Sequence, residues 1–379
     1  MGDSLKKIIL IVLNNFKNDS RVLKESISLQ NAGYNVKVIA LWEEGLKEHK
    51  IIKNIPVHRI KLKSKNWSKN KVIQLLKYFE FLYKVVKEYK DYNIIHCNDL
   101  NALPVGFIIK RFFNKNVKVV YDAHEYETET NGLSGIQKTL TKKLEKFLIR
   151  YANKVITVSD AIAKEYKKLY PFIEEPKLVL NTPLYKKIEK KDLFREKLEI
   201  DKNKTIFLYQ GGLSKGRGIE ILLETFKNID DKNAVIVFMG YGELEKEIKK
   251  VSEQFSNIYF HEAVSPDILL DYTSSADFGI STIEDSCLSY RYCLPNKMFE
   301  YIMAEVPVIV SNLPEMKRVV ENNQIGVVAK KNTPDGLKEA MLKAVKLDKN
   351  ELQTNIQKVK EMYNWGVQEK VLIKVYNEL

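Results

Sequence analysis

A glycine-rich run at residues 210–218 has the residue types needed to hold a phosphate group. It follows a β-branched stretch and precedes a helical pattern, so it lies where a strand leads into a helix. Glycine lets the main chain approach a phosphate closely, and N–H groups at a helix start carry partial positive charge. Gly211 and Gly212 open the turn, while Lys215 and Arg217 add full charges. The run therefore suits a diphosphate, although glycine turns at such positions also serve packing.

A second motif, at residues 294–304, combines an amide, a cation and a carboxylate at helical spacing. Pro295 favours a helix start, which puts Asn296 and Lys297 in the first turn, where an anion is stabilised. Glu300 comes from the next turn, and its carboxylate can accept hydrogen bonds from both hydroxyls of a ribose. The alternative interpretation of Glu300 is a surface glutamate on an ordinary helix.

A turn formed by Gly240, Tyr241 and Gly242 follows the predicted strand at residues 235–239. Ligands of open α/β sheets bind beyond the carboxyl ends of the strands, and this turn lies at such an end. We therefore expect it to pass close to the base of a bound nucleotide.

Polar side chains also follow two predicted strands in the first half of the chain. Asn15, Asp19 and Arg21 follow the first strand, and His124 and Glu125 follow the fourth. In loops of this kind, His124 or Asp19 can bind sugar hydroxyls. We place all five residues on the acceptor side of the site. The alternative is that Asp19 or His124 caps a helix or fixes a turn.

The elements that must position these motifs alternate between strands and helices along the whole chain. Short β-branched runs between helical patterns are typical of parallel sheets covered by helices on both faces. Strands are predicted in the first half at residues 7–13, 36–41, 94–96, 117–121 and 155–158, with a first crossover helix at residues 20–32. Strands are predicted in the second half at residues 178–180, 205–209, 235–239, 258–260, 278–281, 308–310 and 326–328. The pattern predicts two Rossmann-like α/β domains.

A chain of 379 residues is longer than one hydrophobic core usually serves, and a boundary is predicted near residues 170–183. Prolines at positions 171 and 183 bracket a polar passage there, and proline breaks helical continuation. We assign residues 1–170 to an N-terminal domain and residues 171–355 to a C-terminal domain. The end of the chain is helical in pattern, with a bend expected at Trp365-Gly366.

Taken together, the motifs resemble the retaining glycosyltransferases of family 4, which have the GT-B fold. The resemblance rests on residues 19–25, 33–34, 121–125, 157–159, 210–218, 240–242, 276–277 and 295–301, and so covers nearly the whole chain. It implies two Rossmann-like domains whose parallel sheets face across a cleft. It also implies that the second domain binds the donor nucleotide, that the acceptor approaches over the first, and that residues 356–379 form a helix returning to the first domain.

The resemblance further implies residue roles. Arg217 matches the family's phosphate-binding lysine, and Glu300 matches its ribose-binding glutamate. Transfer is implied to proceed with retention of anomeric configuration and without an essential metal.

Two positions depart from the family pattern. Tyr292 stands where the family has a further glutamate, and Glu284 is the candidate to replace it. Gly212 stands where the family has an arginine, so the phosphate charge must be met by Arg217, Lys215, Lys297 or Arg291.

We predict that Arg217, Lys297, His124 and Glu284 are the catalytic residues. Arg217 and Lys297 would stabilise the charge that builds on the departing phosphate. The expected donor is a nucleotide-diphosphate-sugar, with a UDP-sugar favoured, acting as co-substrate without a cofactor or metal. The expected acceptor is a glycan or lipid-linked glycan, in cell-surface polysaccharide or glycolipid synthesis. A nucleotide-sugar epimerase or glycosyl phosphorylase of the same fold is the alternative enzyme.

The formal net charge of +13 is compatible with a polyanionic partner, but a lysine-rich composition also explains it. The basic residues are dispersed and match no nucleic-acid-binding module, so we expect no nucleic-acid partner, although a basic nucleic-acid-binding protein is the non-enzymatic alternative. Residues 61–90 and 138–150 interleave basic and apolar side chains. Helices there suit an anionic membrane surface, and suit a solvated face over an ordinary core equally well.

No apolar run approaches the roughly 18 to 20 residues that a membrane-spanning helix requires. Cys97, Cys287 and Cys293 have neither the spacing of a zinc site nor that of a disulfide framework. We expect a cytoplasmic protein that also has access to the inner face of the cell membrane.

Overall fold

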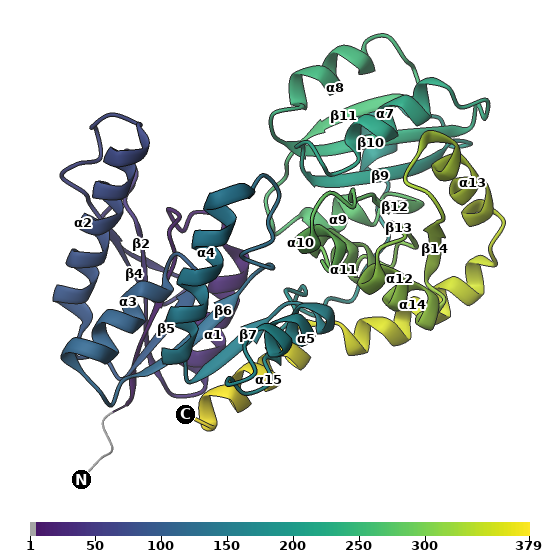
Figure 1. The fold of residues 1–379 in the computed structure, drawn as a ribbon. Coiled ribbons are helices and arrows are strands. Elements are labelled where there is room, and N and C mark those ends of the chain that lie inside the picture. The colour runs from purple at the N-terminus through teal and green to yellow at the C-terminus, as the bar shows by residue number, and fades with distance from the viewer. Residues whose placement is uncertain (1–4) are drawn as a thin grey trace. The chain divides into compact units, whose positions relative to one another are not determined.

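The computed structural model describes residues 5–379, and Figure 1 traces the chain. The chain forms two compact units. The first contains the chain up to Leu180 together with Glu369–Leu379, and the second contains Asn181–Gln368. Each unit is built on a sheet of mainly or wholly parallel strands, so the predicted α/β class is confirmed for both halves.

The first unit contains an eight-stranded sheet in the order β3-β4-β2-β1-β5-β6-β7-β8. Neighbouring strands are parallel except β3 and β4, which form an antiparallel hairpin. Strand β5 is buried along its whole length, as expected for a parallel strand covered on both faces. The strands are β1 (Lys7–Ile11), β2 (Asn35–Leu41), β3 (His49–Ile52), β4 (Ile55–Ile60), β5 (Ile94–Asn98), β6 (Lys118–Ala123), β7 (Lys154–Thr157) and β8 (Lys177–Leu178).

Helices connect these strands. The first begins where the Asp19 carboxylate accepts the Val22 N–H at 3.1 Å, which satisfies a donor that the helix start leaves free. The helices are α1 (Ser20–Asn31), α2 (Lys71–Tyr89), α3 (Leu103–Ile108), which continues into a π-helical turn (Ile109–Phe113), α4 (Gly135–Leu148) and α5 (Asp160–Leu169).

The second unit contains a six-stranded parallel sheet in the order β11-β10-β9-β12-β13-β14. The strands are β9 (Thr205–Gly212), β10 (Ala234–Tyr241), β11 (Ile258–Glu262), β12 (Phe278–Ser281), β13 (Val308–Ser311) and β14 (Gly326–Ala329). The helices are α6 (Leu193–Leu198), α7 (Ile219–Lys227), α8 (Glu245–Ser252), α9 (Leu269–Thr273), α10 (Leu288–Arg291), α11 (Asn296–Met303), α12 (Pro314–Asn323), α13 (Pro334–Val345) and α14 (Lys349–Met362).

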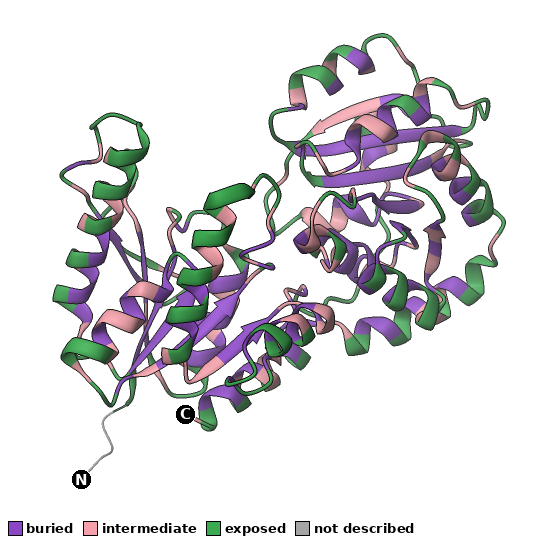
Figure 2. Ribbon diagram, viewed as in Figure 1, coloured by how far each residue is buried: buried purple, intermediate pink, exposed green. Residues whose placement is uncertain are grey.

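The cores lie between the sheets and their helices, and Figure 2 shows buried residues concentrated on the strands of each unit. In the second unit, Phe207 and Phe278 stack across β9 and β12, with ring centroids 5.4 Å apart. Apolar side chains of α7, α8 and α13 pack against these strands in one continuous cluster. The carboxyl ends of the strands are thereby fixed relative to one another, which is what a binding site at that edge requires.

The structure corrects the predicted elements at three places. The strand predicted at residues 178–180 belongs to the first unit, because β8 pairs with β7, so residues 171–180 do not open the second domain. The β3–β4 hairpin was not predicted. The chain end bends where expected, because α14 ends at Met362 and α15 (Trp365–Asn377) begins at Trp365, so residues 356–379 are not one continuous helix. The chain returns to the first unit within α15.

Candidate functional site

The carboxyl ends of β9 and β10 approach each other so closely that only glycine fits. A methyl group on Gly240 would lie 1.9 Å from the Gly211 carbonyl oxygen, and one on Gly242 would lie 2.3 Å from the Leu213 carbonyl oxygen. Gly211 and Gly242 also have φ angles of +109° and +157°. Gly240 and Gly242 therefore have a packing role, and Gly211 has a backbone conformation that favours glycine. Packing and ligand approach are compatible, because Gly211 and Gly212 remain exposed.

The glycine loop is held by main-chain contacts with two other strand ends. The Lys215 N–H donates to the Glu243 carboxylate at 3.0 Å, and the Glu284 N–H donates to the Gly216 carbonyl at 3.1 Å. Gly218, at φ +75°, packs against Thr282, where a methyl group would lie 2.5 Å from the carbonyl oxygen. Glu284, predicted as a catalytic carboxylate, is thus next to the glycine loop, and its described contact is through the main chain.

Arg217 and Lys297 form the charged part of this site. The Lys297 ammonium lies 3.4 Å from the ring centroid of Tyr209, and the Arg217 guanidinium lies 5.2 Å from that of Tyr290. Within residues 5–379, neither cation has a carboxylate within salt-bridge distance, and the Arg217 Nε is buried without a hydrogen bond. Burial and the nearby Arg217 charge hold the pKa of Lys297 well below its usual range, against the opposing attraction of Glu300.

Glu300 is oriented by a chain of hydrogen bonds that reaches back into the core. Its carboxylate accepts from the Gln210 amide at 2.6 Å, and the Gln210 carbonyl oxygen accepts from the Thr273 hydroxyl at 2.8 Å. Tyr301, the next residue on α11, donates to the Leu208 carbonyl and accepts the Gln210 N–H, both at 3.0 Å. Glu300 is therefore held beside the end of β9, partly exposed and close to Lys297.

The remaining predicted donor residues lie around this arrangement. Tyr241 is 65% exposed, and Lys215 and Asn296 are exposed as well, so all three are accessible to a ligand. Arg291, the fourth candidate for phosphate charge, forms a bidentate pair with Asp285 and so already has an anionic partner.

In the first unit, the loop after β1 is shaped by its own side chains. Asp19 caps α1, one of the alternatives for this residue, and the Asn15 side-chain amide donates to Glu43. Arg59, which was not predicted as a site residue, is almost fully buried beneath the loop and donates to the Asn15 carbonyl at 2.8 Å.

A network of opposite charges surrounds Asp122 at the carboxyl end of β6. Arg21 is buried and forms a bidentate contact with Asp122, at 2.8 and 2.9 Å, so it positions that carboxylate rather than reaching a ligand. His124 lies 3.3 Å from Asp122 and 3.3 Å from Asp99, and remains partly exposed. Burial opposes its charge, but the two carboxylates outweigh burial and raise the pKa of His124 to about 9. Glu125, beside it, is exposed.

Behind Asp122 lies a second, fully buried layer. His96 is 3.5 Å from Asp122, and its other ring nitrogen contacts the Tyr376 hydroxyl of α15 at 2.6 Å. Glu25 lies 3.0 Å from Arg21, and burial raises its pKa to about 8 despite that charge. The structure therefore joins Arg21, Asp122 and His124 into one network supported by Glu25 and His96.

Four residues that sequence reasoning missed now belong to these sites: Asp122, Asp99, Arg59 and Gln210. Asp122 stood inside a noted motif, and its place at the end of a predicted strand was the available signal. Asp99 has a φ of +62°, a conformation uncommon for this residue type, and no sequence signal marks it.

Two family models match the chain. Residues 190–361 match glycosyl transferases group 1, and residues 21–181 match glycosyltransferase family 4. An uncharacterized glycosyltransferase of Methanocaldococcus jannaschii is 23% identical over 322 residues, which is 75% of each chain. Chitobiosyldiphosphodolichol beta-mannosyltransferase of Debaryomyces hansenii is 21% identical, covering 88% of this chain and 78% of that protein.

Solved structures share the fold at low identity. Sucrose-phosphate synthase from Thermosynechococcus elongatus is 16% identical, covers 98% of each chain and superposes with a TM-score of 0.82. The Anabaena protein HepE, determined in complex with UDP-glucose, is also 16% identical, covers 98% of this chain and all of its own, and has a TM-score of 0.76. With both halves matched by the family models and the fold shared over the full length, the chain belongs to the family 4 glycosyltransferases of group 1 type and has the GT-B fold.

Proposed function

We propose that this glycosyltransferase uses a nucleotide-diphosphate-sugar, whose diphosphate binds at Arg217 and Lys297 in the second unit. The observation that carries the proposal is that both cations lie at the carboxyl ends of the strands without a carboxylate partner among residues 5–379. An unneutralised, partly buried cation pair costs free energy, which an anion offsets when it binds. As the sugar leaves, charge grows on the diphosphate, and fixed cations there stabilise the transition state.

The nucleoside portion is proposed to bind beside Glu300 and the turn at Tyr241. The Glu300 carboxylate is held by Gln210 and still partly exposed, so it can accept hydrogen bonds from ribose hydroxyls. Tyr241 is exposed at the end of β10 and offers a ring face to a base.

The identity of donor and acceptor is proposed from the relatives. HepE binds UDP-glucose, which supports a UDP-sugar as donor. The Debaryomyces relative is by name a mannosyltransferase acting on a diphosphodolichol-linked chitobiose, which supports a lipid-linked glycan as acceptor. Such an acceptor would place the reaction in polysaccharide or glycolipid synthesis. We further propose that transfer retains configuration and needs no metal; proton NMR of the product linkage, with and without a chelator, tests both points.

The test compares two arginines, of which one already forms an ion pair with a carboxylate and the other does not. Arg217→Ala removes an unpaired cation, whereas Arg291→Ala removes one that is bound to Asp285. UDP- and GDP-sugars are offered with free and lipid-linked glycans, and release of the nucleoside diphosphate is measured. We expect Arg217→Ala to lower turnover by about 100-fold to 1,000-fold, the usual cost of losing one transition-state donor. Arg291→Ala should change turnover by less than about threefold.

Equal rates in the parent and in Arg217→Ala would contradict the proposed diphosphate site. The rise in melting temperature on adding UDP or GDP measures nucleotide binding at the same site and needs no acceptor. That shift should be lost in Glu300→Ala if the ribose binds as proposed.

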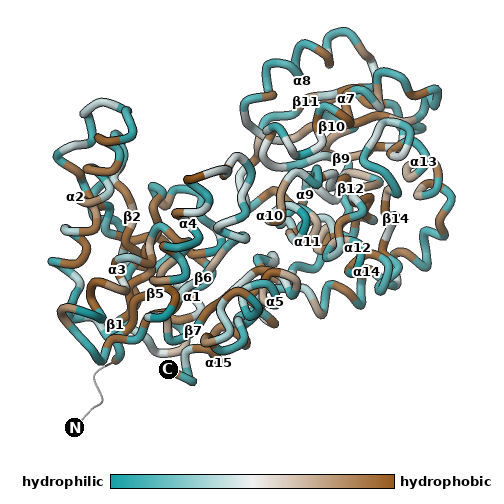
Figure 3. Tube along the Cα trace, viewed as in Figure 1, coloured by the Kyte–Doolittle hydropathy of each residue, from teal (hydrophilic) through white to brown (hydrophobic). Residues whose placement is uncertain are grey.

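We also propose that the first unit contacts an anionic membrane. Exposed apolar side chains recur at helical spacing on two of its helices: Val72, Leu75, Leu76, Phe79 and Tyr83 on α2, and Ile136, Leu140, Leu144 and Phe147 on α4. Figure 3 shows both hydrophobic and hydrophilic segments along α2 and α4. Helix α3 contacts both α2 and α4, so the two helices flank it within the same unit. No helix among residues 5–379 is long and apolar enough to cross a membrane.

Vesicle flotation tests the membrane proposal. We expect the full chain to float with vesicles that contain anionic phospholipid and to remain in solution with zwitterionic ones. The double variant Phe79→Ser/Leu140→Ser should lose flotation, while Leu342→Ser, which changes an exposed leucine of the second unit, should retain it. Flotation that is equal in all variants would reject this surface.

A further inference from the structure

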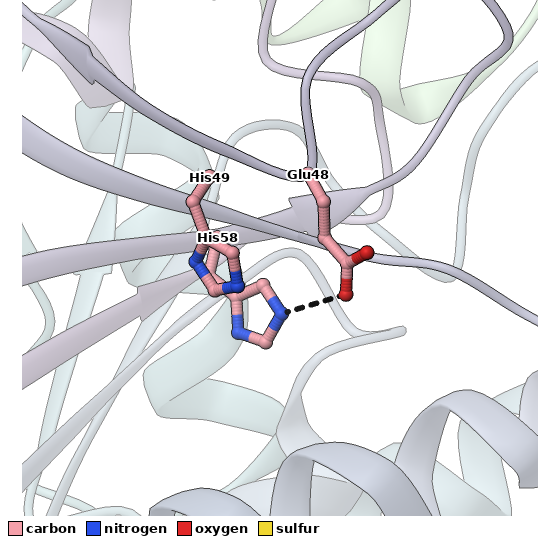
Figure 4. A group of neighbouring side chains, drawn as sticks. All are labelled: Glu48, His49 and His58. Carbon is pink, nitrogen blue, oxygen red and sulfur yellow. Dashed lines mark ion pairs between the residues drawn. The ribbon is translucent and has the colours of Figure 1, made fainter.

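The outer edge of the first sheet carries a cluster of side chains that the proposed sugar transfer does not use. Glu48, His49 and His58 come together on the β3–β4 hairpin, as Figure 4 shows. One ligand-type atom from each of the three lies within 4.8 Å of the other two. Imidazole nitrogens and a carboxylate oxygen at such separations are the donor set of a divalent transition metal.

The turn of the hairpin fixes the two histidines opposite each other. Lys53 and Asn54 have φ angles of +46° and +68°, the conformation of a two-residue turn that matches strand twist. With that turn, Ile52 pairs with Ile55, and counting back along the ladder pairs His49 with His58. Directly opposed residues share one face of a sheet. The rings stack accordingly, with centroids 4.2 Å apart and planes 22° from parallel.

His58 is held in an orientation suited to a ligand. Its Nδ1 lies 3.2 Å from the Glu88 carboxylate and contacts the Tyr89 hydroxyl, both at the end of α2. Its Nε2 instead faces Glu48, 3.6 Å away. In metal sites, a histidine typically binds the metal through one nitrogen while a carboxylate or other acceptor orients the second. Here the orienting contact is already formed.

Charged groups of both signs surround the cluster. Lys37 and Lys50 line the hollow beside the histidines, so the negative charge that offsets a cation comes from Glu48 and Glu88.

We propose that Glu48, His49 and His58 bind a divalent transition-metal ion, with Zn²⁺ the best match, at the outer edge of the first sheet. Two imidazoles and one carboxylate match the protein ligands of a zinc site with one open position. Mg²⁺ and Ca²⁺ prefer oxygen ligands and do not fit this set. Glu48 and His49 are exposed, so their side chains have the freedom to close the remaining distance. A bound ion would join β3 to β4 beyond their main-chain pairing.

A second group of three potential metal ligands lies in the same unit, but it is not available to a metal ion. Glu25, His96 and Asp122 also lie close together, but the Arg21 guanidinium contacts both carboxylates. A guanidinium therefore already fills the place that a metal cation would take.

The experiment uses the full chain, freed of metal with a chelator and then titrated with Zn²⁺ alone by calorimetry. Co²⁺ is titrated in parallel, because its visible absorption reports a low-coordinate site with nitrogen ligands. We expect one ion per chain, a higher melting temperature with Zn²⁺, and no comparable shift with Mg²⁺. His49→Ala and Glu48→Gln change exposed side chains, so both should fold, and each should weaken Zn²⁺ binding at least tenfold.

Two further variants complete the design. Glu88→Gln should weaken binding by about 10-fold to 100-fold, as loss of a group that orients a ligand does. His261→Ala, which removes a histidine of the second unit, should bind Zn²⁺ as the parent does. Absence of saturable binding, or binding that His49→Ala or Glu48→Gln leaves at full strength, would overturn the proposal.

Discussion

The Lys297 ammonium lies against the face of Tyr209, 3.4 Å from the ring centroid, rather than against a carboxylate. An aromatic face attracts a cation, but it compensates less than an anion does for the water lost on burial. Burial first, and Arg217 second, therefore hold the pKa of Lys297 well below its usual range in the free protein. A diphosphate beside it would raise that pKa again.

The first prediction is that Lys297 takes up a proton when the nucleotide binds. UDP binding to the parent, measured above the pKa of free Lys297, should be accompanied by proton uptake, because bound diphosphate favours the charged form of Lys297. Affinity should therefore fall as the pH rises through the pKa of free Lys297. Calorimetry in two buffers with different ionisation enthalpies measures the uptake. Lys297→Met should abolish it, and Lys215→Met, which changes an exposed lysine of the glycine loop, should retain it. Equal uptake in Lys297→Met would assign the proton elsewhere.

The second prediction concerns the close contact between β9 and β10. Gly240→Ala would bring a methyl group within 1.9 Å of the Gly211 carbonyl oxygen, and a backbone atom cannot move aside as a flexible side chain can. We expect the free energy of unfolding of the second unit to fall by at least about 2 kcal/mol, within the range for overpacking. Urea denaturation followed by circular dichroism measures it. Gly212→Ala, which meets nothing within 4 Å, should change stability by no more than about 0.5 kcal/mol. Equal stability of the two variants would contradict this account.

The third prediction tests whether Glu300 must be held in its orientation by Gln210 to bind the donor. Gln210→Ala leaves Glu300 in place but removes the amide that holds its carboxylate at 2.6 Å. We expect the KM for the donor to rise about tenfold, which corresponds to about 1.4 kcal/mol, with kcat changed much less. Gln353→Ala is the matched control, because Gln353 donates to Glu305 at 2.8 Å in the same unit. A donor KM that is unchanged in Gln210→Ala would show that Glu300 needs no such support.

The fourth prediction concerns Glu25 and pH. Its pKa is raised from 4.5 to about 8 in the folded protein, chiefly by burial. The stability that it contributes is thus complete below about pH 4.5 and is lost as the pH rises through about 8, at up to about 1.4 kcal/mol per pH unit. Glu25→Gln stays neutral, so its melting temperature should rise relative to that of the parent between pH 5 and pH 8.

Glu129 supplies the control for that experiment. Burial opposes its ionisation, but hydrogen bonds from Lys138 and Lys142 outweigh burial and lower its pKa. It is therefore ionised in folded and unfolded chains throughout pH 5 to 8, and the difference between Glu129→Gln and the parent should stay constant there. A constant difference for Glu25→Gln as well would mean that Glu25 is ionised when folded.

Local patterns predicted the second unit's site better than the first unit's. The glycine run and the Asn296 to Glu300 motif are each contiguous, and strand-then-helix order places them at one sheet edge. Gln210 and Glu300 are 90 residues apart, so their hydrogen bond depends on which strand lies beneath α11, which periodicity does not reveal. Arg21 illustrates the reverse error: sequence offered it as a ligand-facing residue, but its place on the inner face of α1 buries it against Asp122.

The hairpin escaped prediction for a related reason. A turn of lysine and asparagine lacks the glycine that usually marks a two-residue hairpin, and β3 has only four residues. Without that turn, His49 and His58 are two unremarkable histidines nine positions apart.

The chain passes from the first unit to the second after Leu180 and comes back within α15. Tyr376 of that helix contacts His96, and Glu378, just after the helix, contacts Lys154. No single cut in the gene can therefore release either unit whole. An isolated first unit has to be made as two pieces expressed together, or as a circular permutant that joins the final eleven residues to the rest by a linker. A stop codon only a few residues early would leave the last strand intact but would remove Tyr376, which contacts His96 in the buried layer behind Asp122.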